Sequence, residues 1–316
     1  MTPVVAEVVR SGLVESRHHG SVIGLDRDGT RVLSLGDVDV PVYPRSSLKP
    51  LQALGMLRAG WRPDDDRQVA LACASHSGEP EHVDVVRRIL AAAGLDETAL
   101  DNTADLPLDR AAAHALIRAG GRADPLHQNC SGKHAAMLAT CVAAGWPTSS
   151  YRSPDHPLQL ALRSTVEDTA GETVAAVAVD GCGAPLFALS LAGLARAFAL
   201  VAAAPEGADE PAQVAAAMRA HPFLVGGTGR DVTALMTEVP GLVAKDGAEG
   251  VYAAALPDGR AVALKIDDGS GRARAPVMVA ALERLGVRVE ALAQLAAPPV
   301  LGHGEPVGSI RAALPG

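Results

Sequence analysis

Aromatic residues are scarce in this chain of 316 residues, where they make up 3% of the sequence. Ala, Val and Leu must therefore build the core. The hydrophobic fraction of 48% and the charged fraction of 20% are ordinary for a globular protein. The net charge is −8, and no basic stretch is interleaved with aromatic residues. These features argue against nucleic acid as a partner.

Long apolar runs and a secretory leader are also missing. The first seven residues, MTPVVAE, lack a basic segment followed by a long apolar run. The apolar runs at residues 197–204 and 277–282 are too short to span a bilayer. We therefore expect a cytoplasmic protein that does not interact with a membrane.

Cysteine and lysine are both rare. In a cytosolic chain, each of the four cysteines is expected to be free or metal-bound and not disulfide-paired. Of the 28 basic residues only four are lysines: Lys49, Lys133, Lys245 and Lys265. An amine can lose its proton when it is desolvated, whereas a guanidinium cannot. The lysines are therefore candidates for proton chemistry or metal ligation, although a few lysines can also simply escape a composition bias.

Strand patterns occur near both ends of the chain and helical patterns lie between them. The strand patterns cover residues 21–26, 31–35, 241–245, 250–256 and 260–266. The helical patterns cover residues 48–59, 81–93, 110–119, 133–144, 157–169, 189–203, 210–220 and 274–285.

This order differs from the alternation of strand and helix that a parallel sheet requires. It predicts an α/β fold of the α+β type in one domain spanning residues 1–316. An antiparallel sheet of about five strands would come from residues 1–40 and 240–316, with a helical region at about 46–238 inserted between its halves.

A serine and a lysine stand three residues apart where the first helix should begin. Ser46 and Lys49, in segment 45–50 (RSSLKP), therefore share one helix face. The positive end of a helix disfavours protonated lysine and favours a developing oxyanion, and serine needs an adjacent base to act as a nucleophile. The spacing is typical of a Ser-Lys nucleophile. The alternative is that Ser46 or Ser47 only caps the helix.

Two later segments could complete such a site. Residues 241–247 read as a strand that ends in Lys245-x-Gly247, and a Lys-x-Gly strand borders the active site of Ser-Lys hydrolases. Ser75, in segment 73–79 (CASHSGE), could take the middle position of such a site. The alternatives are a surface lysine beside a turn, ordinary helix capping, or a nucleophile made by the cysteine and histidine of segment 73–79.

A third group has the chemistry of a metal site. Cys130, Lys133 and His134 lie in a loop that opens a helix, and Asp180 and Cys182 follow a strand-like run. The spacing does not fit a structural zinc site of four cysteines, or of two cysteines and two histidines. From the spacing alone, two buried thiols are the stronger interpretation and a metal site is the weaker one.

Together these motifs resemble those of the L-asparaginase II family, Ser-Lys asparaginases that are related in fold to serine β-lactamases and glutaminases. The resemblance extends along nearly the whole chain. It rests on residues 45–50, 73–76, 129–134, 155–157, 180–182, 243–247 and 265–269.

The resemblance implies two Ser-Lys pairs, Ser46 with Lys49 and Ser75 with Lys245. It implies hydrolysis of L-asparagine to L-aspartate and ammonia through an acyl-enzyme. We expect Ser46 to be the nucleophile because its place at a helix start has the clearest physical rationale. Ser75 would then relay a proton or orient the site.

The resemblance also implies how the substrate and a metal would be held. A zinc ion near the substrate would be bound by Cys130, Cys182 and the amine of Lys133, and no organic cofactor is expected. Asp180 would hold the α-amino group of the substrate, with Arg45 and His134 as further substrate-binding residues. A two-fold symmetric homodimer is expected by analogy, and no role follows for Lys265.

Three alternatives stay open. The same chemistry could act on glutamine or a β-lactam. A zinc hydrolase could use metal-bound water, with the serines only binding substrate. An amino-acid binding protein could use an enzyme fold without turnover, although binding alone would not require two Ser-Lys pairs.

Overall fold

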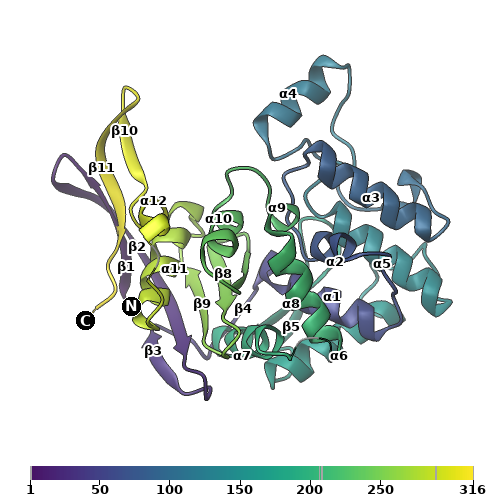
Figure 1. Ribbon diagram of the computed structural model, residues 1–316, viewed down its shortest axis with the longest axis horizontal. Helices are drawn as coiled ribbons and strands as arrows, with labels where there is room; N and C mark the ends of the chain where they lie inside the picture. Colours follow the sequence, from purple (N-terminus) through teal and green to yellow (C-terminus); the bar gives the residue numbers. More distant parts are fainter. Residues whose placement is uncertain (1, 206, 208, 289, 316) are drawn as a thin grey trace.

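A large antiparallel sheet is formed by segments from both ends of the chain (Figure 1). The computed structural model describes residues 2–205, 207, 209–288 and 290–315. The strand order is β10-β11-β1-β2-β9-β8-β7, and β3 pairs with β2. The strands are β1 (Val4–Arg10), β2 (Leu13–Leu25), β3 (Arg31–Leu35), β7 (Val243–Asp246), β8 (Val251–Ala255), β9 (Ala261–Ile266), β10 (Pro299–Gly302) and β11 (Glu305–Ala312).

This arrangement confirms the predicted α+β fold. All five predicted strands are present, as part of β2 and as β3, β7, β8 and β9, and β2 joins the two chain ends by pairing Ile23 with Ala263. The sheet is larger than expected because β1, β10 and β11 extend it to eight strands. Proline and glycine in β10 and β11 weaken the alternating pattern that would have indicated these strands.

Helices fill the middle of the chain, as the sequence predicts. The α-helices are α1 (Lys49–Arg58), α2 (Asp66–Ala72), α3 (Pro80–Ala92), α4 (Arg110–Arg118), α5 (Ser131–Ala144), α6 (Pro157–Ala170), α7 (Leu191–Ala202), α8 (Glu210–Ala220), α9 (Pro222–Val225), α10 (Asp231–Glu238), α11 (Arg274–Arg284) and α12 (Ala293–Ala296). The 3-10 helices are η1 (Arg45–Leu48), η2 (Glu97–Ala99), η3 (Gly271–Ala273) and η4 (Glu290–Leu292). Each predicted helix is found within a few residues. The short helices α2 and α10 were not predicted, because seven or eight residues carry little periodicity.

The sheet is covered on both faces around β8 and β9. Every residue of β8 is buried, and in β9 only Lys265 is not fully buried. Helices α7 and α11 both contact β9 and supply this cover. Strands buried on both faces read as continuous apolar runs, which is the pattern that the sequence shows here.

Helix α1 lies at the centre of the helical region and joins it to the sheet. Its residues from Lys49 to Leu57 are buried, and it contacts α2, α5, α6 and α8. The preceding η1 contacts β7 and β8. The start of this helix is therefore fixed where the helical region meets the sheet, and the candidate catalytic residues lie there.

A second, small sheet has the order β4-β6-β5. Its strands are β4 (Pro41–Val42), β5 (Ala176–Val179) and β6 (Pro185–Ser190). Strand β6 is entirely buried, and Ser190 Oγ caps α7 by accepting a hydrogen bond of 2.8 Å from the Gly193 backbone N–H. The predicted helix at 189–203 therefore starts two residues later than expected. The β5–β6 turn carries Asp180 and Cys182.

Within the described ranges, no helix is both long enough and apolar enough to cross a bilayer.

Candidate active site

The backbone is strained immediately before the first candidate serine. Arg45 has φ of 53°, in the left-handed region that a non-glycine residue adopts at a cost of roughly 1–3 kcal/mol. Its guanidinium Nε donates a 2.8 Å hydrogen bond to Asp180 Oδ1, and Glu249 lies 3.8 Å from Nη1. These ion pairs hold the conformation that leads the chain into η1.

Ser46 and Lys49 lie one helical turn apart, as their spacing predicts. The Lys49 backbone N–H donates to the Ser46 carbonyl oxygen where η1 passes into α1. Ser46 is half-buried, and within the described ranges no protein group hydrogen-bonds to its Oγ, whereas Lys49 is 1% exposed. The serine hydroxyl is thus accessible while the lysine is enclosed.

The buried amine of Lys49 meets the other candidate serine. Lys49 Nζ donates hydrogen bonds to Ser75 Oγ at 3.1 Å, to the Asn129 carbonyl at 3.4 Å and to the Ala74 carbonyl. The structure therefore connects the two expected pairs through Lys49 and Ser75. In the part of the chain that the structure describes, no side-chain hydrogen bond joins Ser46 to Lys49 or Ser75 to Lys245.

Lys245 enters the same interior from the end of β7. It is fully buried, and its Nζ donates to Asp246 Oδ1 at 2.6 Å and to the Asp246 carbonyl at 2.7 Å. Burial, together with the charges of Lys49 and Arg230, lowers the pKa of Lys245 to about 8, although Asp246 opposes this shift. Lys245 can therefore exist as a neutral amine near physiological pH.

The glycine of the Lys-x-Gly motif permits β7 to approach η1 closely. A Cβ atom on Gly247 would lie 2.5 Å from the Pro44 carbonyl oxygen and 2.9 Å from Ser47 Oγ. Ser47 Oγ also donates a 3.2 Å hydrogen bond to the Lys245 carbonyl. These contacts hold the strand that carries Lys245 against the segment that carries Ser46.

The segment around Ser75 contains no second nucleophile. Cys73 is completely buried, and burial raises its pKa to about 12. His76 Nε2 lies 2.8 Å from Ser131 Oγ, while its Nδ1 accepts a hydrogen bond from the Gly78 N–H. The alternative pair of Cys73 and His76 is therefore not a nucleophile and its base.

The three candidate metal ligands converge in one place. Cys130 directly precedes α5, Lys133 lies in the first turn of that helix, and Cys182 lies in the β5–β6 turn. Lys133 Nζ donates to Cys182 Sγ at 3.2 Å, and the Cys130 thiol also hydrogen-bonds to Cys182. All three residues are buried.

One thiol of this group is poised to ionise. The hydrogen bond from Cys130 and the charge of Lys133 outweigh burial and lower the pKa of Cys182 to about 5. That hydrogen bond and burial raise the pKa of Cys130 to about 12. Burial opposes the charge of Lys133, but the two thiols and Asp180 raise its pKa overall. The group is therefore an ammonium–thiolate pair with one neutral thiol.

This donor set fits a zinc ion only if the lysine takes part. Thiolate is a common zinc donor, and a lysine amine offers a lone pair only after it has lost its proton. Among the residues that the structure describes, no three His, Cys, Asp or Glu side chains are grouped to hold a metal. Two sulfur atoms and the Lys133 nitrogen would therefore form the set, and zinc would have to displace the protons of Lys133 and Cys130.

The predicted substrate-binding residues surround this group. Burial raises the pKa of Asp180, but Lys133 and Arg45 outweigh it and hold that pKa below the usual range. His134 Nδ1 lies 2.7 Å from the Tyr151 hydroxyl, whereas its buried Nε2 has no protein partner in the described ranges. These residues therefore lie beside the candidate metal ligands. The charge of Lys133 acts on Asp180, Arg45 binds Asp180, and His134 follows Lys133 in α5.

A pocket of about 520 Å³ adjoins the site through Arg45. Lys265, for which the sequence indicates no role, lies in the wall of this pocket. Its Nζ donates a hydrogen bond of 2.6 Å to the Ile266 carbonyl oxygen. The described lining residues are Val42, Tyr43, Arg45, Ala178, Val179, Leu186, Glu249 and Lys265.

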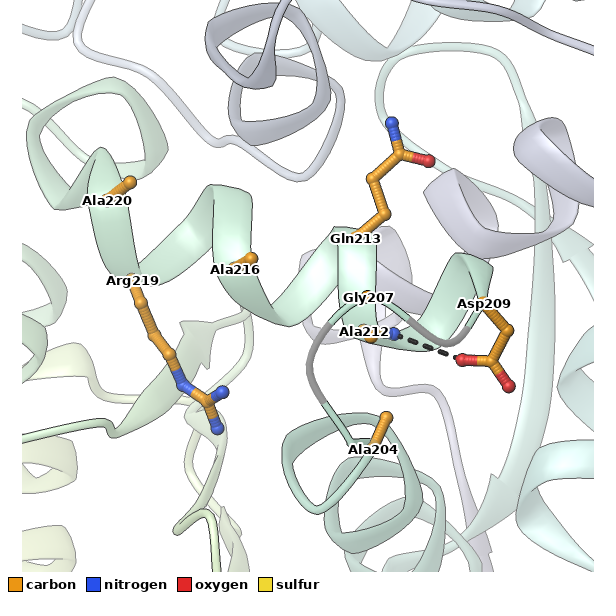
Figure 2. A pocket seen from close by; sticks show the side chains of 8 residues that line it. All are labelled: Ala204, Gly207, Asp209, Ala212, Gln213, Ala216, Arg219 and Ala220. Carbon is orange, nitrogen blue, oxygen red and sulfur yellow. Dashed lines mark hydrogen bonds between the residues drawn. The ribbon is translucent and has the colours of Figure 1, made fainter.

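A pocket of about 800 Å³ lies elsewhere, along α8 (Figure 2). Half of its described lining residues are alanine, and two of its polar residues have structural roles. Asp209 caps α8 by accepting from the Ala212 N–H, and Arg219 donates to the carbonyls of Gly241 and Ala202. This pocket therefore contains none of the candidate catalytic side chains.

Four important residues escaped the sequence analysis: Arg230, Asp231, Asp246 and Arg274. They surround the amine of Lys245 or support its neighbours. Asp246 follows Lys245 directly, so its position in the Lys-x-Gly motif was visible. No local pattern, however, connects it with an arginine 16 residues earlier.

Comparison with known proteins gives one match over nearly the whole chain. Residues 6–312 match the family described as L-asparaginase II. No curated protein matches the chain. Among solved structures, the chain is similar to a β-lactamase from Mycobacterium bovis, with 15% identity, a TM-score of 0.45, and coverage of 90% of this chain and 96% of that one. It is also similar to EstCE1, a hydrolase with promiscuous acyltransferase activity, with 14% identity, a TM-score of 0.42 and coverage of 89% and 92%.

The close approach at Gly247 predicts a loss of stability in Gly247→Ala. The added methyl group meets the backbone of Pro44, which cannot rotate away, so the free energy of unfolding should fall by about 1–3 kcal/mol. Chemical denaturation measures this change. The control is Gly271→Ala, whose methyl group would meet nothing closer than 3.7 Å. Equal stability of the two variants would contradict the contact.

Ionisation of Cys182 should be visible in the metal-free protein. Thiolate ultraviolet absorbance should rise as the pH is raised through about 5, and this step should vanish in Cys182→Ser. Cys141→Ser should keep it, because burial raises the pKa of that thiol to about 11. The folded pKa of Cys182 lies below the ordinary 9.0. Its contribution to stability is therefore fully present above pH 9 and is lost as the pH falls towards 5. A step that survives in Cys182→Ser would assign the thiolate to another residue.

Proposed function

The chain belongs to the L-asparaginase II family, and we propose that it is an amidohydrolase that converts L-asparagine to L-aspartate and ammonia. The observation that carries this proposal is the hydrogen bond from Lys49 Nζ to Ser75 Oγ, in a buried interior that also holds Lys245. Serine hydroxyls beside amines that are sheltered from water are the groups that acyl transfer from an amide requires.

Ser46 is the nucleophile in this proposal. Its hydroxyl is half-exposed and has no protein partner within the described ranges, so a substrate carbonyl can approach it. Ser75 is 4% exposed and already accepts a hydrogen bond from Lys49, which suits an internal relay better than attack. Arg45, with its strained φ, is the first residue of η1, and Ser46 follows it in the same turn.

The proton path runs through both lysines. Lys49 donates three hydrogen bonds to fixed acceptors, as an ammonium group does. To accept a proton from Ser46, Lys49 would first pass one through Ser75 to Lys245. Lys245 can receive this proton only as a neutral amine, and that form becomes populated near pH 8 because burial lowers the pKa of Lys245 to about 8. The rate should therefore rise as the pH increases through about 8, where Lys245 becomes neutral.

The bond changes follow the acyl-enzyme scheme. Ser46 Oγ bonds to the amide carbon while its proton moves to Lys49, and backbone N–H groups at the helix start stabilise the oxyanion. The carbon–nitrogen bond then breaks, and the nitrogen takes the proton and leaves as ammonia. Water attacks the resulting ester and gives a proton to the lysine. Return of that proton to Ser46 releases aspartate.

Substrate recognition is assigned to the polar residues beside the thiol group. Asp180 keeps its charge because Lys133 and Arg45 hold its pKa down, so it can bind the α-amino group. Arg45, which already pairs with Asp180, and His134, whose Nε2 has no described partner, complete the binding surface. The same surface could admit glutamine, and the assay below separates the two amides.

We assign zinc to Cys130, Lys133 and Cys182. The support is the convergence of these three buried donors on one another. A bound zinc ion would supply positive charge that orients the substrate. The protein itself must keep the two sulfur atoms and the amine together, which α5 and the β5–β6 turn do.

A cytoplasmic location and a two-fold dimer are part of the same proposal. All four cysteines are free and buried. A reducing compartment would keep Cys130 and Cys182 as thiols available to metal. The dimer is proposed by analogy with other symmetric enzymes.

Loss of either serine should separate the catalytic roles. In Ser46→Ala, kcat for ammonia release from L-asparagine should fall by about three orders of magnitude, because the acyl-enzyme cannot form. Ser75→Ala should also lower kcat, through loss of the relay, and Ser149→Ala, an exposed serine, serves as the control. Ammonia is measured from L-asparagine and from L-glutamine.

Each result has a defined meaning. Activity on asparagine that both catalytic variants lose supports the two-pair mechanism. Activity that survives Ser46→Ala contradicts the serine nucleophile and favours metal-bound water. Faster release from glutamine would change the substrate, and binding without turnover in the folded wild-type protein would contradict the enzyme assignment.

Metal binding can be tested without an activity assay. Cobalt(II) added to the metal-free protein should produce thiolate-to-metal charge-transfer absorption, which Cys130→Ser and Cys182→Ser should lose and Cys141→Ser should keep. Because Lys133 and Cys130 must lose protons, the apparent affinity should increase with pH. Binding without a thiolate band, or equal binding by all three variants, would refute the assigned ligands.

A further inference from the structure

A partly buried ionic cluster lies behind Lys245 and is not used in the proposed reaction. It consists of Arg230, Asp231, Asp246 and Arg274, and is called the Asp246 cluster below. Asp246 Oδ2 lies 2.8 Å from Arg230 Nη2 and 3.4 Å from Arg274 Nη1, and Asp231 Oδ2 lies 3.8 Å from Arg274 Nη2. The other carboxylate oxygen of Asp246 binds Lys245 Nζ.

Asp246 connects both members of the second Ser-Lys pair. It binds the amine of Lys245 directly. It also binds Arg230, whose Nη1 donates a 3.2 Å hydrogen bond to the Ser75 carbonyl oxygen. Arg274 adds a hydrogen bond to the Gly247 carbonyl at the end of the same strand. One carboxylate therefore links β7 to the Ser75 segment and to the starts of α10 and α11.

Burial favours a neutral Lys245, and the charges of the cluster act in both directions. Desolvation is the largest cause of the lowered pKa of Lys245, Asp246 opposes this shift, and Arg230 adds to it. The groups that face Lys245 are Asp246 from β7, Lys49 from α1, Arg230 at the start of α10 and the neutral thiol of Cys73 after α2. Tyr252, opposite Asp246 on β8, stays a neutral phenol because burial raises its pKa. Asp246 is thus the nearby anion that opposes two cations.

We propose that Asp246 is the positioning residue of the second Ser-Lys pair. It holds the Lys245 amine in place, limits how easily that amine loses its proton, and aligns Ser75 through Arg230. The inference rests on the proposed function, in which Lys245 receives the proton that leaves Ser46. Asp246 itself touches neither the substrate nor the reacting atoms.

The scarcity of lysine permits a direct measurement. The chain has four lysines, so protein labelled with ¹³C and ¹⁵N only at lysine gives four side-chain resonances, and Lys245→Met identifies that of Lys245. In Asp246→Asn, the titration midpoint of Lys245 should fall from about 8 by about one pH unit or more, because Lys49 and Arg230 are no longer opposed. The acidic limb of kcat/KM for ammonia release should shift in the same direction, with kcat lower by about 10–100-fold.

Two further variants separate positioning from general loosening of the structure. Arg230→Gln removes a cation, so the Lys245 midpoint should move upwards, opposite to its shift in Asp246→Asn. Asp231→Asn removes the same charge from the same cluster, but Asp231 makes no hydrogen bond to Lys245 in the described ranges, so its effect should be smaller. Asp246→Glu should restore most of the wild-type midpoint.

An unchanged midpoint in Asp246→Asn would overturn the inference, as would shifts in the same direction for Asp246→Asn and Arg230→Gln. If Asp246→Asn does not fold, Arg230→Gln still decides the question, because it removes the link from Asp246 to Ser75. An upward shift of the Lys245 midpoint with a lower kcat supports the inference, and an unchanged midpoint and kcat overturn it. Failure of the proposed function has a different signature. The wild-type protein would release no ammonia, while the titration of Lys245 would still report on Asp246.

Discussion

The burial of two lysine amines in one interior is the constraint on which this structure depends. Lys49 and Lys245 are 1% and 0% exposed, and an unpaired charge in such a place would cost several kcal/mol. The partners that make burial tolerable come from separate parts of the chain. Lys49 uses the carbonyls of Ala74 and Asn129 and the hydroxyl of Ser75. Lys245 uses the adjacent Asp246, whose own partners Arg230 and Arg274 come from other segments. Neither amine can be buried until these segments have assembled, so the site and the fold form together.

Close backbone approach is a consequence of this assembly. A buried amine reaches its partners only if the surrounding segments lie within one side-chain length. Gly247 lets β7 lie against the Pro44 carbonyl. Gly132 does the same for α5, because a Cβ atom on Gly132 would lie 2.6 Å from the Leu71 carbonyl oxygen. The backbone of Arg45 adopts a left-handed conformation in the same region, and Asp180 holds the Arg45 side chain in place. Close contacts and a strained residue are therefore found around the amines.

The thiol group solves the same electrostatic problem in a different way. Lys133 is also buried, and its charge is balanced by the thiolate of Cys182 together with the nearby carboxylate of Asp180. That balance lowers the pKa of one thiol and leaves the proton on Cys130. Two neighbouring sites in one interior thus use lysine for different chemistry, and both depend on desolvation.

The sequence by itself determined the fold class, the five central strands, the main helices and the identity of the chemical groups. These follow from local periodicity, from the place of Ser46 and Lys49 on one helix turn, and from the rarity of lysine and cysteine. It could not determine which groups meet. Lys49 bonds to Ser75 26 residues away, and Arg230 bonds to Asp246 16 residues away, without any local pattern. The strands β1, β10 and β11 were missed because their pairing, and not their composition, stabilises them. Only the tertiary structure decides such contacts, because burial and partner choice depend on packing between segments that are distant in the chain.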